Sequence, residues 1–183
     1  LIKFNYSDYR KLKNQGNHCP SENLYFKESI TWSDLTTKAF GARLSPEGAV
    51  FDVKGSSGFP KVDKYSVLAL LCSNFINYMM KVINPTMTFQ VGDLSRVPFI
   101  NGDWTKISEL SQKAVSITKR NSSYKETSYL FKQASLNIDE QLIKHTIERY
   151  WDTVRKDFLD IYNLERDINT LINSMYRLTD VIK

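Results

Sequence analysis

The sequence predicts an α+β fold, with a small mixed domain of a few strands and one main helix followed by an all-helical segment. Short runs rich in β-branched and aromatic residues fall within residues 1–100. From Asp103 onward, apolar residues recur instead at helical spacing. We therefore expect an α/β domain over residues 1–100 and a helical bundle or spacer over residues 101–183.

Three strands are expected in the first part, over residues 24–32, 40–44 and 50–53. The last two are separated by Ser-Pro-Glu-Gly at residues 45–48, which has proline and glycine where a turn requires them. Gly-Ser-Ser-Gly at residues 55–58 predicts a flexible loop after the third strand.

One helix is expected over residues 63–83, where apolar residues share a single helical face. Asn84 should end it, because a residue before proline is pushed out of the helical region. Residues 87–91 then predict a returning strand, and residues 93–97 a short helical turn.

The second part predicts three amphipathic helices. The first covers residues 104–114. The second begins at Asn137, a helix-capping residue type with Glu140 three positions later. A joint at Tyr162 and Asn163 separates it from a third helix over residues 164–178.

Composition restricts the function only mildly. The net charge of +5 and the pI of about 9.1 favour polyanionic partners. No apolar run reaches the ~18 residues that a membrane helix needs. Cys19 and Cys72 lie in unlike surroundings, which favours free thiols and a reducing, cytoplasmic location. The start at Leu1, without an initiator methionine, suggests a fragment of a longer polypeptide.

Catalytic and metal-binding patterns are weak throughout. Residues 84–87 read Asn-Pro-Thr-Met, whereas an amino-methyltransferase needs a second proline and an aromatic ring to hold the flipped base. Asp52 and Lys54 resemble half of a nuclease site, but no second carboxylate is evident on a neighbouring strand. His18 and Cys19 have no partners at zinc-ligand spacing. We expect no catalytic residue, metal site or cofactor site in this chain.

Several long segments resemble one family. They are YFKESITWSDLTTKAFGARLSPEGAVFDVKGSSGFP and LLCSNFINYMMKVINPTMTFQVGDLSRVPF, followed by the shorter YKETSYLFKQASL and FLDIYNLERDI. Together they are similar to the C-terminal target-recognition region of phage-growth-limitation (BREX-type) adenine-specific DNA methyltransferases. Tyr129 stands where that family usually has Trp, and Asn163 where it usually has Gly. The likeness covers residues 25–168 and leaves residues 1–20 unassigned.

The resemblance implies a DNA-specificity region related to those of TaqI-like methyltransferases and type I specificity subunits. Its partners would be double-stranded DNA, its own N-terminal methyltransferase domain and other defence-system subunits. S-adenosylmethionine would bind in that catalytic domain. Fused restriction-modification enzymes carry the same module. The resemblance therefore allows two parent proteins, a BREX-type methyltransferase or a fused restriction-modification enzyme.

The expected DNA contacts lie on cationic and hydroxyl side chains near the glycine-rich loop, where backbone can approach a ligand closely. The expected contact residues are Arg43, Lys54, Ser56, Ser57, Lys61 and Lys64. The alternative interpretation of each residue is an ordinary solvent-exposed or turn residue that has no contact with DNA. The aromatic residues Tyr25, Phe26, Trp32 and Phe40 are assigned to the core.

Two functions of different classes therefore remain. The first is sequence-specific recognition of duplex DNA for an adenine-specific methyltransferase. The second is a structural or protein-interaction module, whose helical half docks onto the methyltransferase domain or onto partner subunits.

Overall fold

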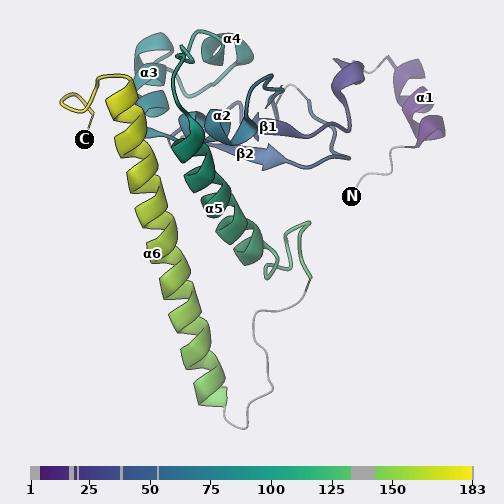
Figure 1. Cartoon of the computed structure of the whole chain (residues 1–183). Coiled ribbons are helices and arrows are strands. Elements are labelled where there is room, and N and C mark those ends of the chain that lie inside the picture. Colours follow the sequence, from purple (N-terminus) through teal and green to yellow (C-terminus); the bar gives the residue numbers. More distant parts are fainter. Residues whose placement is uncertain are drawn as a thin grey trace.

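The computed structural model describes residues 5–16, 19, 21–37, 39–52, 54–132 and 143–182. A three-stranded antiparallel sheet with short helices is followed by two long helices that lie side by side (Figure 1). The predicted α+β class is confirmed. The capping pair predicted at Asn137 and Glu140 lies outside the described residues.

The sheet consists of β1 (Ser29–Trp32), β2 (Ala42–Ser45) and β3 (Ser57–Gly58), in the order β2-β1-β3. Ile30 pairs with Leu44 on one side and with Gly58 on the other. The first strand falls within its predicted range, and the second overlaps the predicted residues 40–44 but continues to Ser45, which was predicted to begin the turn. The third was predicted wrongly, because residues 50–52 form no strand and part of the expected loop does.

Local hydrogen bonds account for the shifted third strand. The Asp52 Oδ1 atom accepts the backbone N–H groups of Lys54 and Gly55, at 2.9 and 2.8 Å. This side-chain turn reverses the chain before Ser57 can pair with β1. The prediction of strand from residue 24 was also too long, since a 3₁₀ turn covers Glu22–Leu24.

The helix predicted over residues 63–83 is in fact two, α2 (Lys64–Leu71) and α3 (Asn74–Ile83), bent by 64°. Ser73 lies at the break and is 1% exposed. Its hydroxyl donates to the Leu70 carbonyl at 2.6 Å and accepts the Ile76 N–H at 3.3 Å. A buried serine that caps a new helix in this way ends the old one.

The predicted stop before Pro85 is confirmed, since Asn84 has extended backbone angles and ends α3. The strand predicted over residues 87–91 is wrong. It is reduced to one bridge between Thr88 and Leu35, and α4 (Val91–Leu94) begins where the strand should end. The Asp93 side chain accepts the Gln90 N–H at 3.2 Å, which favours a helical start there.

The described residues form three further α-helices: α1 (Tyr6–Asn14), α5 (Thr105–Ser122) and α6 (Ile143–Met175). The joint predicted at Tyr162 and Asn163 is wrong, because α6 runs through both residues without a break. Asn163 is exposed, so its weak helix propensity is outweighed by the apolar residues that pack on either side of it.

Two clusters form the core. One lies under the sheet and gathers the buried residues Trp32, Phe40, Ile76, Met80 and Phe89. The other joins α2 and α3 to the long helices and gathers Ala69, Leu70, Phe75, Ile107, Leu110, Ile168 and Ile172. The domain boundary near residue 100 stays a prediction, and the second cluster draws its members from both sides of it.

No single helix within the described ranges is long and apolar enough to cross a membrane. The helices α2 and α3 meet the length and hydropathy criteria only as a bent pair, and their apolar residues supply much of the core.

Candidate nucleic-acid interface

The sheet has one apolar and one polar face. Neighbouring residues along a strand point to opposite faces, and paired residues on adjacent strands share a face. Ile30 and Trp32 are buried toward the helices. The register places the alternate residues on the other side, as two rows across the strands. We call this the polar sheet face, and its residues are Ser29, Thr31, Arg43, Ser45 and Ser57. Ser29 is only 5% exposed, so the accessible part of the face consists of the other four residues.

Arg43 is the cation of the polar sheet face. It lies on β2 directly opposite Thr31 on β1, which in turn is opposite Ser57 on β3. Arg43 is exposed, whereas Thr31 and Ser57 are half-buried. The Ser29 and Ser57 hydroxyls lie 3.4 Å apart. The register thus aligns Arg43 with two hydroxyl residues, and a guanidinium offers several hydrogen-bond donors to a phosphate or a base edge.

The two predicted serines lie in different environments. Ser56 is buried, and its carbonyl accepts the Trp32 N–H at 3.1 Å and the Thr31 hydroxyl at 2.9 Å. These contacts give Ser56 a structural role in holding β3 against β1. Ser57 belongs to the polar sheet face and is the more accessible of the pair.

Lys54 lies against a carboxylate. Its Nζ atom is 2.9 Å from Oδ2 of Asp34, whose side chain is 9% exposed. Asp34 also accepts the Phe89 N–H through its carbonyl, at 2.7 Å. The Lys54 side chain itself is 79% exposed, so its charge faces solvent while it neutralises a buried acid. Asp34 is thus held by a lysine and does not form a two-carboxylate metal site with Asp52.

Lys64 has a carboxylate partner, as Lys54 does, whereas Lys61 has none among the described residues. Lys64 donates to Glu28 at 2.5 Å, and this hydrogen bond raises the pKa of the Lys64 ammonium. Lys61 is exposed, and no ion pair is found for it among the described residues. Among the predicted cations, Arg43 and Lys61 therefore present charge that no described carboxylate offsets.

The predicted core aromatics are mostly buried. Tyr25, Trp32 and Phe40 are each less than a tenth exposed, and the Trp32 indole N–H donates to the Phe89 carbonyl at 2.9 Å. The prediction for Phe26 is wrong. Its φ of 65° is left-handed, and its side chain is 46% exposed. The left-handed turn at Phe26 directs the ring away from the core.

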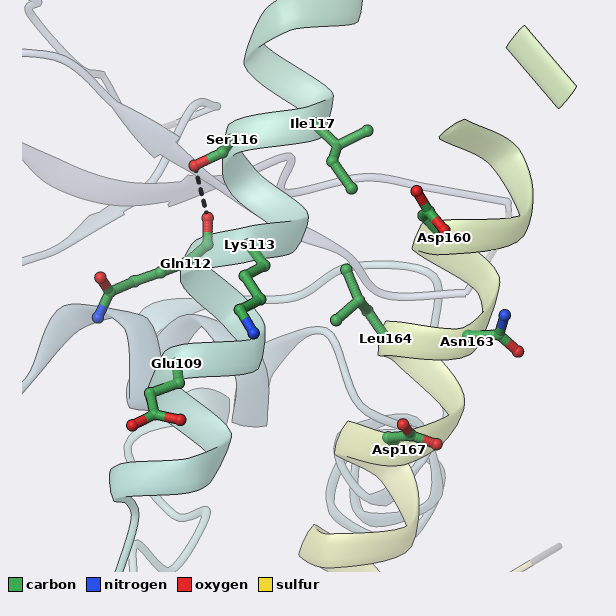
Figure 2. Close-up of a pocket in the computed structure, with 9 residues that line it drawn as sticks. All are labelled: Glu109, Gln112, Lys113, Ser116, Ile117, Asp160, Asn163, Leu164 and Asp167. Atoms are coloured by element: carbon green, nitrogen blue, oxygen red, sulfur yellow. Dashed lines mark hydrogen bonds between the residues drawn. The ribbon is translucent and has the colours of Figure 1, made fainter. Parts of the chain in front are cut away.

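A hollow of about 870 Å³ lies elsewhere, between α5 and α6 (Figure 2). Ile117 and Leu164 project into the space between the helices, and Asp160 and Asp167 line its α6 side. With Glu109 also on its border, this hollow does not suit a phosphate. Within the described part of the chain, no group of three or more His, Cys, Asp or Glu residues is arranged to hold a metal ion.

Comparison with known proteins relates almost the whole chain to one kind of enzyme. It is 28% identical to the adenine-specific methyltransferase BrxX of Escherichia coli O9:H4 (strain HS) over 179 residues, which are 96% of this chain. It is 30% identical to the adenine-specific methyltransferase PglX of Lacticaseibacillus casei (strain Zhang) over 163 residues, or 85% of the chain. The chain is distantly homologous to a region of these methyltransferases.

That region is a small part of each relative. The aligned residues make up 15% of BrxX and 14% of PglX. Because the match to BrxX covers 96% of the chain, the related region includes both the sheet and the long helices. No family model matches the chain.

Sequence reasoning missed most of the polar sheet face. It selected Arg43 and Ser57 but not Ser29, Thr31 or Ser45. The alternation of polar and apolar residues in Ser-Ile-Thr-Trp and Ala-Arg-Leu-Ser was the available signal. Using it required the register between strands that are distant in sequence, which the pattern alone does not define.

Proposed function

We propose that this chain is the target-recognition region of an N6-adenine DNA methyltransferase from a phage-defence or restriction-modification system. The relation to BrxX and PglX along nearly the whole chain is the observation that carries the proposal. A methyltransferase acting at one adenine needs both a base-flipping catalytic site and a way to read the flanking bases.

In this proposal the polar sheet face lies toward duplex DNA. Arg43 is the candidate for a base edge, since a guanidinium matches the two acceptors of guanine in the major groove. Lys54, Lys61 and Lys64 contact phosphates beside it, while Ser57 adds a hydroxyl donor. Ser56 positions this edge through its backbone.

The methyl donor, S-adenosylmethionine, binds outside this chain in the proposal. The described strands form an antiparallel sheet, and no described strand leads through a glycine-rich turn into a helix that would cradle a nucleoside cofactor. We therefore propose that the catalytic region supplies the cofactor site. The partners are duplex DNA, that catalytic region and other defence-system subunits, in the cytoplasm.

Duplex binding measured by fluorescence anisotropy at increasing salt tests the DNA-reading role. Contact with four to six phosphates gives a log–log salt slope of roughly −4 to −5. Replacing Lys54, Lys61 and Lys64 together by Glu is expected to lower the slope by roughly three, with a large loss of affinity. Absence of binding at low salt would reject the proposal.

Two controls separate binding from folding. Lys54 and Lys64 also neutralise Asp34 and Glu28, so urea unfolding of the triple variant must show a folded protein. The variants Lys61→Glu and Arg43→Gln avoid that problem. Arg43→Gln is expected to relax discrimination at one base pair by about 1–3 kcal/mol. The exposed Lys106→Glu, on α5, provides a matched charge change away from the sheet.

A docking role for the helical half is the second candidate function. The observation that favours it is the set of large apolar side chains exposed on α6. The two roles are compatible, since a recognition region must also be held against its catalytic region.

A further inference from the structure

The N-terminal half of α6 exposes an unusual amount of apolar surface. Trp151 is 60% exposed, Phe158 67% and Tyr162 58%. Together with Ile147 and Val154 they recur at steps of four, three, four and four residues, which places them on one side of the helix. We call these five residues the α6 stripe: Ile147, Trp151, Val154, Phe158 and Tyr162.

Apolar residues in the C-terminal part of α6 are instead packed into the interior. Ile168 and Ile172 are buried in the core cluster shared with α2, α3 and α5. Leu164 and Ile117 line the hollow between the two long helices (Figure 2). An ion pair between these helices joins Arg120 to Asp157 at 2.5 Å, and α5 ends two residues after Arg120. Beyond that point α6 continues past the end of α5 (Figure 1), and Tyr124 and Lys125, just after α5, border a hollow that Val154 also lines.

The part of α6 that extends past the end of α5 is substantial. Residues 143–156 of α6 extend for about 20 Å at the rise of an α-helix. Exposed apolar patches of this kind mark interaction sites on soluble proteins. Because the stripe has the spacing of a helix-packing seam, the partner that fits it is another helix. The stripe runs alongside the existing seam with α5, so a second helix at this place would extend the bundle.

Charges on the border of the stripe indicate the character of that helix. Lys144, Arg155 and Arg166 recur every eleven residues, or about three turns, along its side away from α5. Lys144 lies 3.9 Å from Glu148, and Arg166 donates to Asp167 at 3.1 and 3.3 Å, whereas no ion pair of Arg155 is found among the described residues. A partner helix with acidic residues on the matching border would be attracted to this row.

We infer that the α6 stripe docks an amphipathic, acid-bordered helix of the catalytic methyltransferase polypeptide. This inference rests on the proposed function, because it takes that polypeptide as the partner. Some 15% of BrxX and 14% of PglX align with the present chain, so most of each relative is available to cover the stripe. A second copy fits less well, since an antiparallel pairing that aligned the two stripes would bring the Arg155 residues together at the two-fold axis.

Hydroxyl-radical footprinting with mass spectrometry tests the inference. The oxidation rates of Trp151, Phe158 and Tyr162 are measured in this chain alone and with the catalytic polypeptide, either joined to it or added separately. Rates several-fold lower in the presence of the catalytic polypeptide support docking. Tyr129, which is 65% exposed on the segment after α5, should keep its rate and provides the internal control.

A pair of matched variants tests the energetics. Trp151→Glu with Phe158→Glu should weaken association with the catalytic polypeptide by about 30-fold or more, the effect of losing one interface hot spot. The control pair His145→Glu and Lys156→Glu alters exposed residues on the opposite side of the same helix and should leave association unchanged. Circular dichroism confirms that both proteins keep their helix content.

Three results would overturn the inference. They are unchanged oxidation rates with the catalytic polypeptide, protection that instead follows self-association of this chain, and protection by duplex DNA alone. DNA affinity is measured in parallel. Loss of DNA binding with the stripe still protected would reject the DNA-reading role and leave docking in place. DNA binding with an unprotected stripe would reject docking alone.

Discussion

At the residue scale, the pairing of α5 with α6 is most sensitive to charge at Asp157. Its side chain is 5% exposed, and its carboxylate accepts from Arg120, which is 51% exposed. A buried carboxylate without a cation is costly, because water no longer solvates it. The main effect of the ion pair is therefore to offset the cost of burying the Asp157 carboxylate. Its net contribution to the free energy of unfolding is smaller than the loss expected when Arg120 is removed.

This geometry predicts that removing Arg120 alone destabilises the fold more than removing the charges of both Arg120 and Asp157. Arg120→Ala should lower the free energy of unfolding by about 3 kcal/mol, the lower end for a broken buried pair, since Arg120 is half exposed. Adding Asp157→Asn should recover part of that loss, because the stranded charge is removed. Urea unfolding measures both, with Lys113→Ala on the same helix expected within about 0.5 kcal/mol of the unaltered protein. A double variant no more stable than Arg120→Ala would contradict this account.

The three lysines of the candidate site differ in their ion pairs. Sequence reasoning treated Lys54, Lys61 and Lys64 as equivalent cations. The fold distinguishes them, because Asp34 and Glu28 come from outside the loop and bind two of the three. Opposite charges brought together from distant parts of the chain cannot be recognised from loop composition.

At the scale of the element, α2 depends on its cap. The Asp63 carboxylate accepts the Ser66 N–H at 2.7 Å and the Ser66 hydroxyl at 2.7 Å. Partial burial opposes the charge, but hydrogen bonds from Ser66 and Ser108 outweigh it and lower the pKa of Asp63 below the ordinary 3.8. The ionised cap thus stabilises a helix that supplies Leu68, Ala69 and Leu70 to the interior.

The cap predicts a pH dependence of stability. A carboxyl whose pKa is lower in the folded state stabilises the fold above its unfolded value and loses that contribution as pH falls through the folded pKa. Asp63→Ala should cost about 1 kcal/mol at pH 7, and Asp63→Ser much less, because serine also caps. Thermal unfolding should show the advantage of the unaltered protein over the Asp63→Ala variant shrinking as pH falls below 3.8. An advantage independent of pH would exclude the ionised cap as its cause.

At the scale of the whole molecule, the interior crosses the predicted domain boundary. Phe75 from α3 lies in one cluster with Ile107 from α5 and with Ile168 and Ile172 from α6. Removing the long helices would expose the apolar side of α2 and α3 to water. The two parts are therefore coupled in stability, whatever their separate roles.

Truncation tests this coupling. A chain of residues 1–100 is expected to lack a cooperative unfolding transition, because the cover of Leu70 and Phe75 is lost. In the whole chain, Ile172→Ala should cost about 2–5 kcal/mol, and this cost should appear in probes on the sheet as well as in the helices. Hydrogen exchange followed by mass spectrometry reports on both regions. Exchange in the sheet that is unaffected by Ile172→Ala would show two independent units.

The sequence by itself determined the α+β class, the amphipathic helices, the stop before Pro85 and the resemblance that relates the chain to DNA methyltransferases. These follow from local propensity, periodicity and motif. Tertiary structure alone decided the break at Ser73, the unbroken helix through Asn163, the strand at Ser57 and the ion pairs of Lys54 and Lys64. Each of these depends on contacts between residues far apart along the chain, and local patterns carry no information about which distant groups will meet.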